Sequence, residues 1–194
     1  MSEEEKLDIP SIDLLEEELE KEQYKSRYKR TLRNTVFFLM VAAAAAVLMA
    51  MLLVPVLQIS GSSMADTLQD GDVVVALRVP DYRVGNIIAF YHNNDILVKR
   101  VIVKAGDWVS IDKNGDVYVN EELIEEAYVK EKVIGNCNIV FPYQVPDGEY
   151  FVMGDQRSVS VDSRNSDVGC VDRDMAIGRI FFRIWPLPAF GTVN

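Results

Sequence analysis

The stretch ISGSSMADTLQDGD, residues 59–72, separates an uncharged apolar segment from a series of short β-type segments. Ser62 and Ser63 stand directly before the apolar Met64, and the turn-forming residues Asp-Gly-Asp end the stretch. This pattern predicts a small polar platform supported by an apolar side chain. A serine hydroxyl becomes a nucleophile only when a base takes its proton, so the base has to come from another part of the chain.

The composition limits what that base can be. The sequence has one histidine, His92, so a Ser-His-Asp triad could be built in only one way. Together with Cys137 and Cys170 it offers too few ligands for an ordinary zinc site, and we expect no metal and no cofactor. A lysine base is the alternative. The net charge of −10 and the pI near 4.6 argue against a nucleic-acid partner, which would need a basic face.

Residues 35–57 form a run of 23 residues without a charged side chain. At a rise of about 1.5 Å per residue, this run predicts a helix that crosses a membrane. It is longer than the apolar core of a cleaved signal peptide, which is about 7–15 residues, so we expect it to remain as an anchor. Six basic residues lie at 21–33. By the positive-inside rule they place the N-terminus in the cytoplasm and the chain after the anchor outside.

Three parts are therefore expected: a charged cytoplasmic tail at 1–34, a transmembrane helix at 35–57 and an extracytoplasmic domain at 58–194. Ser11 is a candidate N-cap for a helix in the tail, with acids early and bases late as the helix dipole prefers. This helix could bind a partner, and the alternative interpretation is a solvated helix or a disordered tail.

After residue 72 the chain consists of short apolar segments separated by turns. We expect strands at 73–77, 86–91, 96–103, 108–111, 117–119, 138–141, 150–153 and 177–184. The Asn114-Gly115 pair is the strongest hairpin signal. No long amphipathic helix is indicated after residue 58, so we predict a mainly β fold, an antiparallel β-sheet domain preceded by a single transmembrane α-helix.

The expected strand at 96–103 contains the candidate base, Lys99, among β-branched apolar residues. Burial of an ammonium group is costly, so such surroundings favour the neutral amine, which can act as a general base. A like charge on Arg100 would lower the pKa of Lys99 further. The alternative interpretation is that Lys99 points outward from an edge strand and only solvates it.

A third polar group of residues lies between 154 and 164. Asp162 and Arg164 are predicted to form a structural ion pair, and Ser160 or Ser163 could donate a hydroxyl that orients a lysine amine. An ordinary polar loop is the alternative.

These three groups, in this order and at these relative positions, resemble the type I bacterial signal peptidases over residues 36–186. The resemblance implies that Ser63 is the nucleophile and Lys99 the general base of a membrane-bound endopeptidase that removes signal peptides from exported preproteins. It implies supporting roles for Ser160, Asp162 and Arg164. The oxyanion hole of the family is built around the backbone N–H of the nucleophile. The compact domain is similar to the enzymes of Gram-positive bacteria.

The chain departs from the family pattern at several positions. Asp66 replaces the proline that usually precedes Thr67, and Gly61 stands where some members carry a second serine. Gly85-Asn86 and Gln156 replace an aspartate and an asparagine that are common in the family. We expect the enzyme to be active despite these changes.

Met64, Leu68 and Val98 are expected to wall shallow apolar pockets, against which an extended substrate adds as a strand. If these three residues only fill the core, no substrate selectivity follows. The implied partners are preprotein signal peptides and the membrane lipid bilayer, and contact with the secretion machinery is compatible with this setting. Cys137 and Cys170 both fall outside the membrane, where a disulfide could persist, with two free thiols as the alternative.

Two other functions fit parts of the sequence. One is a catalytically inactive, membrane-anchored β domain that binds exported proteins without cleaving them. The other is a self-cleaving repressor-type protease, which would share the serine and lysine. A transmembrane segment in place of a DNA-binding domain argues against the latter.

Overall fold

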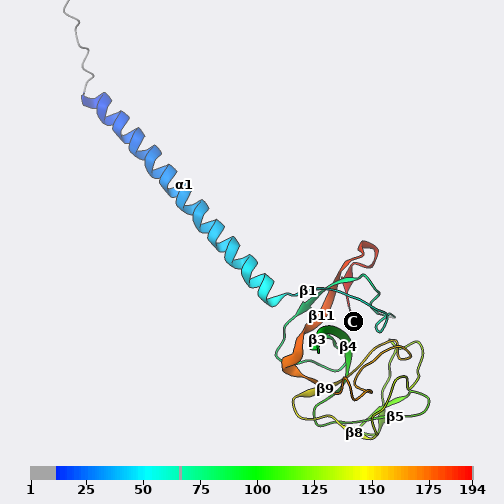
Figure 1. The fold of residues 1–194 in the computed structure, drawn as a ribbon. Coiled ribbons are helices and arrows are strands. Elements are labelled where there is room, and N and C mark those ends of the chain that lie inside the picture. Colours follow the sequence, from blue (N-terminus) through cyan, green and yellow to red (C-terminus); the bar gives the residue numbers. More distant parts are fainter. Residues whose placement is uncertain (1–11, 66, 194) are drawn as a thin grey trace, which may run out of the picture. The chain divides into compact units, whose positions relative to one another are not determined.

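The computed structural model describes residues 12–65 and 67–193, which divide near residue 50 into a helical unit and a β unit. The helical unit is one continuous helix, α1 (Ile12–Leu53), of 42 residues (Figure 1). The tail helix expected from the sequence and the apolar segment are therefore a single element. The predicted cap, Ser11, lies outside the described residues.

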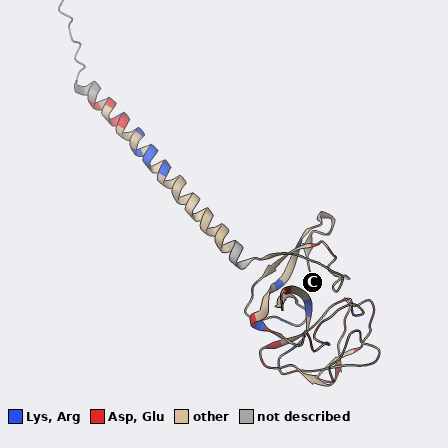
Figure 2. Ribbon diagram, in the orientation of Figure 1, with Lys and Arg blue, Asp and Glu red and all other residues tan. Residues whose placement is uncertain are grey.

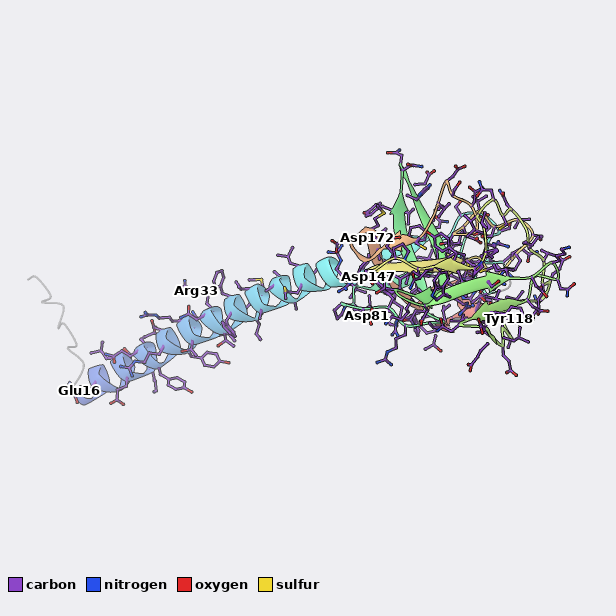
Figure 3. The ribbon with its side chains drawn as sticks, turned by 90° about the horizontal axis from the view of Figure 1, so that it is seen from below. Glu16, Arg33, Asp81, Tyr118, Asp147 and Asp172 are labelled. Atoms are coloured by element: carbon purple, nitrogen blue, oxygen red, sulfur yellow. The ribbon has the colours of Figure 1, made fainter. Side chains whose placement is uncertain are left out.

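Charge is divided along α1. Figure 2 shows acidic residues at its N-terminal end, basic residues after them, and then a long stretch without charge. Side chains project from all round the helix, with Glu16 near its start and Arg33 further along (Figure 3). Within the described part of the chain, α1 is the one helix that is long and apolar enough to cross a membrane.

The helix is shorter at its C-terminal end than the predicted transmembrane segment. It ends at Leu53, and Val56–Gln58 already form the first strand of the β unit. Pro55 explains the boundary, because a proline disfavours helical geometry in the residue before it. The last four residues of the predicted 35–57 segment are thus outside the helix.

The β unit contains twelve described strands and two short 3₁₀ helices. The strands are β1 (Val56–Gln58), β2 (Val73–Leu77), β3 (Ile87–His92), β4 (Asp95–Lys104), β5 (Trp108–Ile111), β6 (Val117–Val119), β7 (Glu122–Leu123), β8 (Tyr143–Gln144), β9 (Glu149–Met153), β10 (Val171–Asp172), β11 (Ala176–Trp185) and β12 (Gly191–Thr192), and the 3₁₀ helices are η1 (Arg173–Met175) and η2 (Leu187–Ala189).

The strands form two antiparallel sheets. The larger has the order β1-β2-β11-β3-β4-β9-β10, with β12 also paired to β11, and the smaller has the order β7-β6-β5-β8. Every described pairing is antiparallel. The predicted fold class, a mainly antiparallel β domain after one long helix, is confirmed.

Strand β3 lies at the centre of the larger sheet, between β11 and β4 (Figure 1). Its residues alternate between two apolar clusters: Ile87 and Ala89 pack in one, Ile88 and Phe90 in the other. A strand buried on both faces has to be apolar without interruption, which explains the sequence IIAF. Each large side chain buried here contributes about 1.5–3 kcal/mol.

A third apolar cluster joins the two sheets. Val109, Ile111 and Val117 of the smaller sheet pack against Ile102 and Phe151 of the larger one. The β5–β6 hairpin predicted from Asn114-Gly115 is confirmed by the pairing of these strands. The third cluster thereby fixes the smaller sheet against β4, the strand that contains the candidate base, and against its neighbour β9.

One predicted strand is wrong. Residues 138–141 form no strand but an irregular segment. The backbone N–H of Asn138 donates to the carbonyl oxygen of Arg164 at 3.0 Å, and its side-chain amide donates to Ser166 at 3.0 Å. The polar groups of this segment are thus used to hold the loop that contains Arg164, and the apolar residues Ile139 and Phe141 pack against the third cluster.

The hairpin turn leads to a stability prediction. Gly115 has φ of +84°, and a Cβ placed on it would lie 2.4 Å from the backbone nitrogen of Val133. Gly148 has φ of +80° but open space around it. Gly148→Ala should therefore lower the free energy of unfolding by only about 1–2 kcal/mol, the cost of a left-handed conformation for a residue with a Cβ atom. Gly115→Ala should lower it clearly more. Chemical unfolding of the full-length protein in detergent measures both; equal losses would show that the close approach to Val133 is unimportant.

Candidate active site

Ser63 and Lys99 lie within hydrogen-bond distance. Lys99 is in the middle of β4, and its Nζ atom is 2.7 Å from the Oγ atom of Ser63, on the loop between β1 and β2. We call residues 59–72 the nucleophile loop. The residues are 36 positions apart in sequence, so the fold brings the pair together. When the amine is neutral, the serine hydroxyl donates to it, which is the geometry required for proton removal.

The Lys99 amine is buried, with 3% of the residue exposed. Burial is the largest cause that holds the pKa of Lys99 below its ordinary value. The negative charge of Asp162 opposes this shift, and the positive charge of Arg164 adds to it. The alternative interpretation, that Lys99 only solvates an edge strand, is therefore wrong, because β4 lies between β3 and β9.

The like charge that acts on Lys99 comes from Arg164, and Arg100 is not among the causes of the shift. The Arg100 guanidinium is instead held by Asp155, at 2.9 Å to Oδ1 and 2.7 Å to Oδ2. It also donates to the carbonyl oxygen of Gly85 at 2.8 Å. Arg100, the sequence neighbour of Lys99, is thus paired with the carboxylate of Asp155.

Asp162 and Arg164 form the predicted ion pair. Nε and Nη2 of Arg164 lie 2.8 Å from Oδ1 and Oδ2 of Asp162, and neither side chain is exposed. Asp162 also accepts a hydrogen bond from the backbone N–H of Gly154 at 2.9 Å. Loss of one partner of a buried pair leaves an uncompensated charge and costs about 3–5 kcal/mol.

The two serines of this loop have partners other than the lysine. The Ser160 hydroxyl donates to Oδ2 of Asp162 at 2.7 Å, and the Ser163 hydroxyl accepts from the backbone N–H of Val152 at 2.9 Å. Among the described residues, the hydrogen bond of the Lys99 amine is to Ser63. Ser160 therefore acts on Asp162, whose charge influences Lys99.

The loop after β9 holds the nucleophile loop directly. The backbone N–H of Gln156 donates to the carbonyl oxygen of Ser63 at 3.0 Å, and the Thr67 hydroxyl donates to Asp155. A Cβ on Gly154 would lie 2.5 Å from the Ser63 carbonyl oxygen and 2.3 Å from the Ser160 Oγ atom. Only glycine permits this approach.

A third buried ion pair, between Arg157 and Glu126, was not predicted from the sequence. Both terminal nitrogens of Arg157 bind the Glu126 carboxylate, and the Arg157 Nε donates to the carbonyl oxygen of Gly154 at 3.1 Å. Neither side chain is exposed. Glu126 lies in a sequence rich in charge, residues 121–132, which indicates a solvated surface. No local pattern distinguishes this one acid from its exposed neighbours.

A groove of about 260 Å³ runs beside the serine and the lysine. It is lined by residues 56–61 on one side, 96–99 on the other, and Ser63 and Met64. Met64 and Val98 therefore lie at the groove as expected. Leu68 does not: it is fully buried and packs in the cluster with Met64 and Val74. For Leu68 the alternative interpretation, a core residue, is correct.

Two positions at which the chain departs from the family pattern are Asp66 and Gly61. Asp66 lies outside the described residues. Gly61 has φ of +91°, and its backbone N–H donates to Oδ1 of Asp70 at 2.8 Å. In the described part of the chain, no group of three or more His, Cys, Asp or Glu residues is arranged to hold a metal ion.

The predicted disulfide is wrong, because Cys137 and Cys170 are both free thiols. Cys170 packs against the third apolar cluster, and burial raises the pKa of its thiol to about 12. The Cys137 sulfur lies 4.0 Å from the carbonyl oxygen of Ile139. The two thiols thus make separate contacts and are not joined to each other.

Comparison with known proteins identifies the family of the chain. Residues 32–185 match the family described as signal peptidase, peptidase S26. The chain belongs to this family. It is 36% identical over 154 residues to signal peptidase IB of Staphylococcus aureus, which covers 68% of this chain and 78% of that protein.

Two more distant relatives extend the comparison. The chain is 34% identical over 145 residues to thylakoidal processing peptidase 1 of Arabidopsis thaliana, covering 66% of this chain and 41% of that one. A crystal structure of a signal peptidase I from Enterococcus faecalis is 26% identical, with a TM-score of 0.44; the match covers 53% of this chain and 98% of that one. Members of this family are serine peptidases, in agreement with the Ser63–Lys99 contact.

The pKa shift of Lys99 leads to a prediction about stability. A lysine with a lowered pKa in the folded state binds its proton more readily when unfolded, so its burial opposes folding below that pKa. The penalty disappears as the pH rises above the ordinary pKa of 10.5. Lys99→Met should therefore raise the thermal unfolding temperature at pH 7, and the gain should shrink towards pH 10.

Lys104→Met, on the same strand, is the control. Lys104 is partly exposed and paired with Asp81 at 2.8 Å, so its replacement should bring no such gain. A Lys99→Met protein that is less stable than wild type at pH 7 would contradict the assignment of a strained, buried amine.

Proposed function

We propose that this chain is a membrane-anchored endopeptidase that removes N-terminal signal peptides from exported preproteins, with Ser63 as nucleophile and Lys99 as general base. The observation that carries the assignment of roles is the 2.7 Å contact between the Ser63 hydroxyl and a buried amine of lowered pKa. This contact supports an active enzyme over a domain that only binds exported proteins.

The first stage of the proposed reaction is the attack of Ser63 on the scissile bond. Neutral Lys99 takes the proton of Ser63 as Oγ attacks the scissile carbonyl carbon, and the carbonyl oxygen becomes an oxyanion. The backbone N–H of Ser63 has no acceptor among the described residues, so it is available to stabilise that charge. Protonated Lys99 then gives its proton to the leaving amine, and a peptidyl ester on Ser63 remains.

Water completes the reaction. Lys99, neutral again, activates a water molecule that attacks the ester, and Ser63 leaves with the proton returned by the lysine. Asp162 and Arg164 influence this amine with opposite charges, and both are held in place by burial. We assign them, with Ser160, the role of fixing the electrostatic surroundings of the base.

The substrate is placed in the groove between residues 56–61 and 96–99. An extended peptide can add there as a strand, with main-chain hydrogen bonds giving affinity and alternate side chains facing Met64 and Val98. The groove has a volume of about 260 Å³ and apolar lining residues, so we expect it to take small side chains at the first and third positions before the cut.

The anchor determines where the chemistry takes place. The basic residues that precede the apolar part of α1 favour a cytoplasmic N-terminus, and this supports the proposal that the β unit is an extracytoplasmic protease domain. Signal peptides carry an apolar segment of their own in the same bilayer. The bond to be cut then lies just beyond the outer end of that segment, within reach of Ser63.

The dyad assignment predicts the following cleavage rates on a model preprotein. Ser63→Ala, Lys99→Ala and Lys99→Arg should each lose at least about a thousandfold in kcat, since guanidinium does not deprotonate in proteins. Ser62→Ala should keep activity within about twofold, because Ser62 is exposed and does not line the groove. Equal losses at Ser62 and Ser63, or full activity of Lys99→Arg, would refute the assignment.

The groove predicts substrate selectivity. Preproteins with alanine, glycine or serine at the first and third positions before the cut should be cleaved, while leucine or phenylalanine at the first position should reduce kcat/KM by about a hundredfold or more, because extra volume cannot be accommodated. Val98→Ala should partly relax this exclusion, and Leu68→Ala, away from the groove, should not. Efficient cleavage after phenylalanine by wild type would contradict the pocket assignment.

A further inference from the structure

The nucleophile loop is held by a second set of contacts, separate from those of Asp155 and Gln156. Asp72, at the end of the loop, is 3% exposed. Its Oδ2 atom accepts a hydrogen bond from Nη1 of Arg183 at 2.6 Å and another from the backbone N–H of Gln69 at 3.0 Å. A buried carboxylate needs such a partner, so the position of Asp72 depends on Arg183.

Asp72 passes this constraint to the start of the loop. Its carbonyl oxygen accepts from the backbone N–H of Ile59 at 2.8 Å, and the carbonyl oxygen of Ile59 accepts from Gly71 at 3.0 Å. The Gly61 N–H is held by Asp70 at 2.8 Å. These bonds close the loop at its base and leave only a few residues between the closed base and Ser63.

Arg183 itself is fixed by the C-terminal strands. It lies on β11, where it pairs with Val74 of β2, and its Nε donates to the carbonyl oxygen of Ala189 in η2 at 3.0 Å. Its side chain is 19% exposed. The planar guanidinium can hold the turn and the carboxylate at once, which the single ammonium of a lysine does less well.

We propose that the Arg183–Asp72 ion pair is a positioning element of the reaction: it sets the place of the Ser63 Oγ atom relative to the Lys99 amine. The inference deepens the proposed function and rests on it. Misplacement of a reacting atom by about 1 Å can cost a hundredfold in rate, so a loop attached at only one side would lower kcat. One wall of the groove, residues 96–99, belongs to β4 and does not depend on Asp72.

The same strand offers a matched control. Arg179 is also an arginine of β11, and its Nε atom is the one buried side-chain nitrogen or oxygen in the described residues without a hydrogen-bond partner. Arg179→Met removes the same charge from the same strand without affecting the nucleophile loop.

The experiment measures kcat and KM of the full-length protein in detergent on a model preprotein across pH. The variants are Arg183→Met, Asp72→Asn, their double mutant, Arg183→Lys and Arg179→Met. Arg183→Met and Asp72→Asn should each lower kcat at least about tenfold with KM within about twofold. The double mutant should be no slower than the slower single variant, and Arg183→Lys should recover part of the loss.

The pH profile separates positioning from general damage. Arg183 and Asp72 are not among the groups that shift the pKa of Lys99, so the maximal rate should fall while the midpoint of the rising limb stays. Arg179→Met should match wild type. If Arg183→Met does not fold, Asp72→Asn and Arg183→Lys give the same comparison, with folding checked by thermal unfolding.

The results that would overturn the positioning role differ from those that would overturn the proposed function. Wild-type kcat in Arg183→Met or Asp72→Asn, additive losses in the double mutant, or a loss confined to KM would overturn the positioning role and leave the proposed function intact. Failure of wild type itself to cleave the preprotein would overturn the proposed function and this inference with it.

Discussion

The site depends on the burial of one amine. Lys99 is on an interior strand of the larger sheet, where its side chain is almost fully buried, and the cost of an ammonium group there keeps the pKa of the amine low. A neutral amine next to a serine hydroxyl is reactive, but it opposes folding at neutral pH. The three apolar clusters around β3, β4 and β9 supply the stability that permits it.

Buried charge elsewhere in the domain is always paired in the described contacts. Arg100 binds Asp155, Arg157 binds Glu126, and Arg164 binds Asp162, each with at most 5% of the residue exposed. The arginines also donate to backbone carbonyls, so each pair fixes a segment of irregular chain. Loops lack the regular backbone hydrogen bonds of a β-sheet, and these ion pairs hold their side chains at defined positions instead. Lys99 is the exception: its described hydrogen bond is to Ser63 and not to a carboxylate, as its proposed role as a base requires.

Several features could be predicted from the sequence alone, because each has a local cause. The uncharged run predicts the long helix, the alternation of short apolar segments with turns predicts the antiparallel strands, and Asn114-Gly115 predicts the β5–β6 hairpin. The errors also have local causes. Residues 138–141 look like a strand by composition, but their backbone is used by the loop around Arg164, and Leu68 looks like a pocket wall but is needed in the core.

The sequence by itself determined the kinds of element, the helix long and apolar enough to cross a membrane and the serine and lysine proposed as the dyad, because apolar periodicity, turn residues and residue scarcity are properties of the chain. Only the tertiary structure decided which charge acts on which group. Arg100 is next to Lys99 in sequence but serves Asp155, whereas Arg164, 65 positions away, acts on the amine. Glu126 and Arg183 likewise gain their roles from distant partners. Electrostatic interaction depends on distance and burial in space, and neither is encoded in the local order of residues.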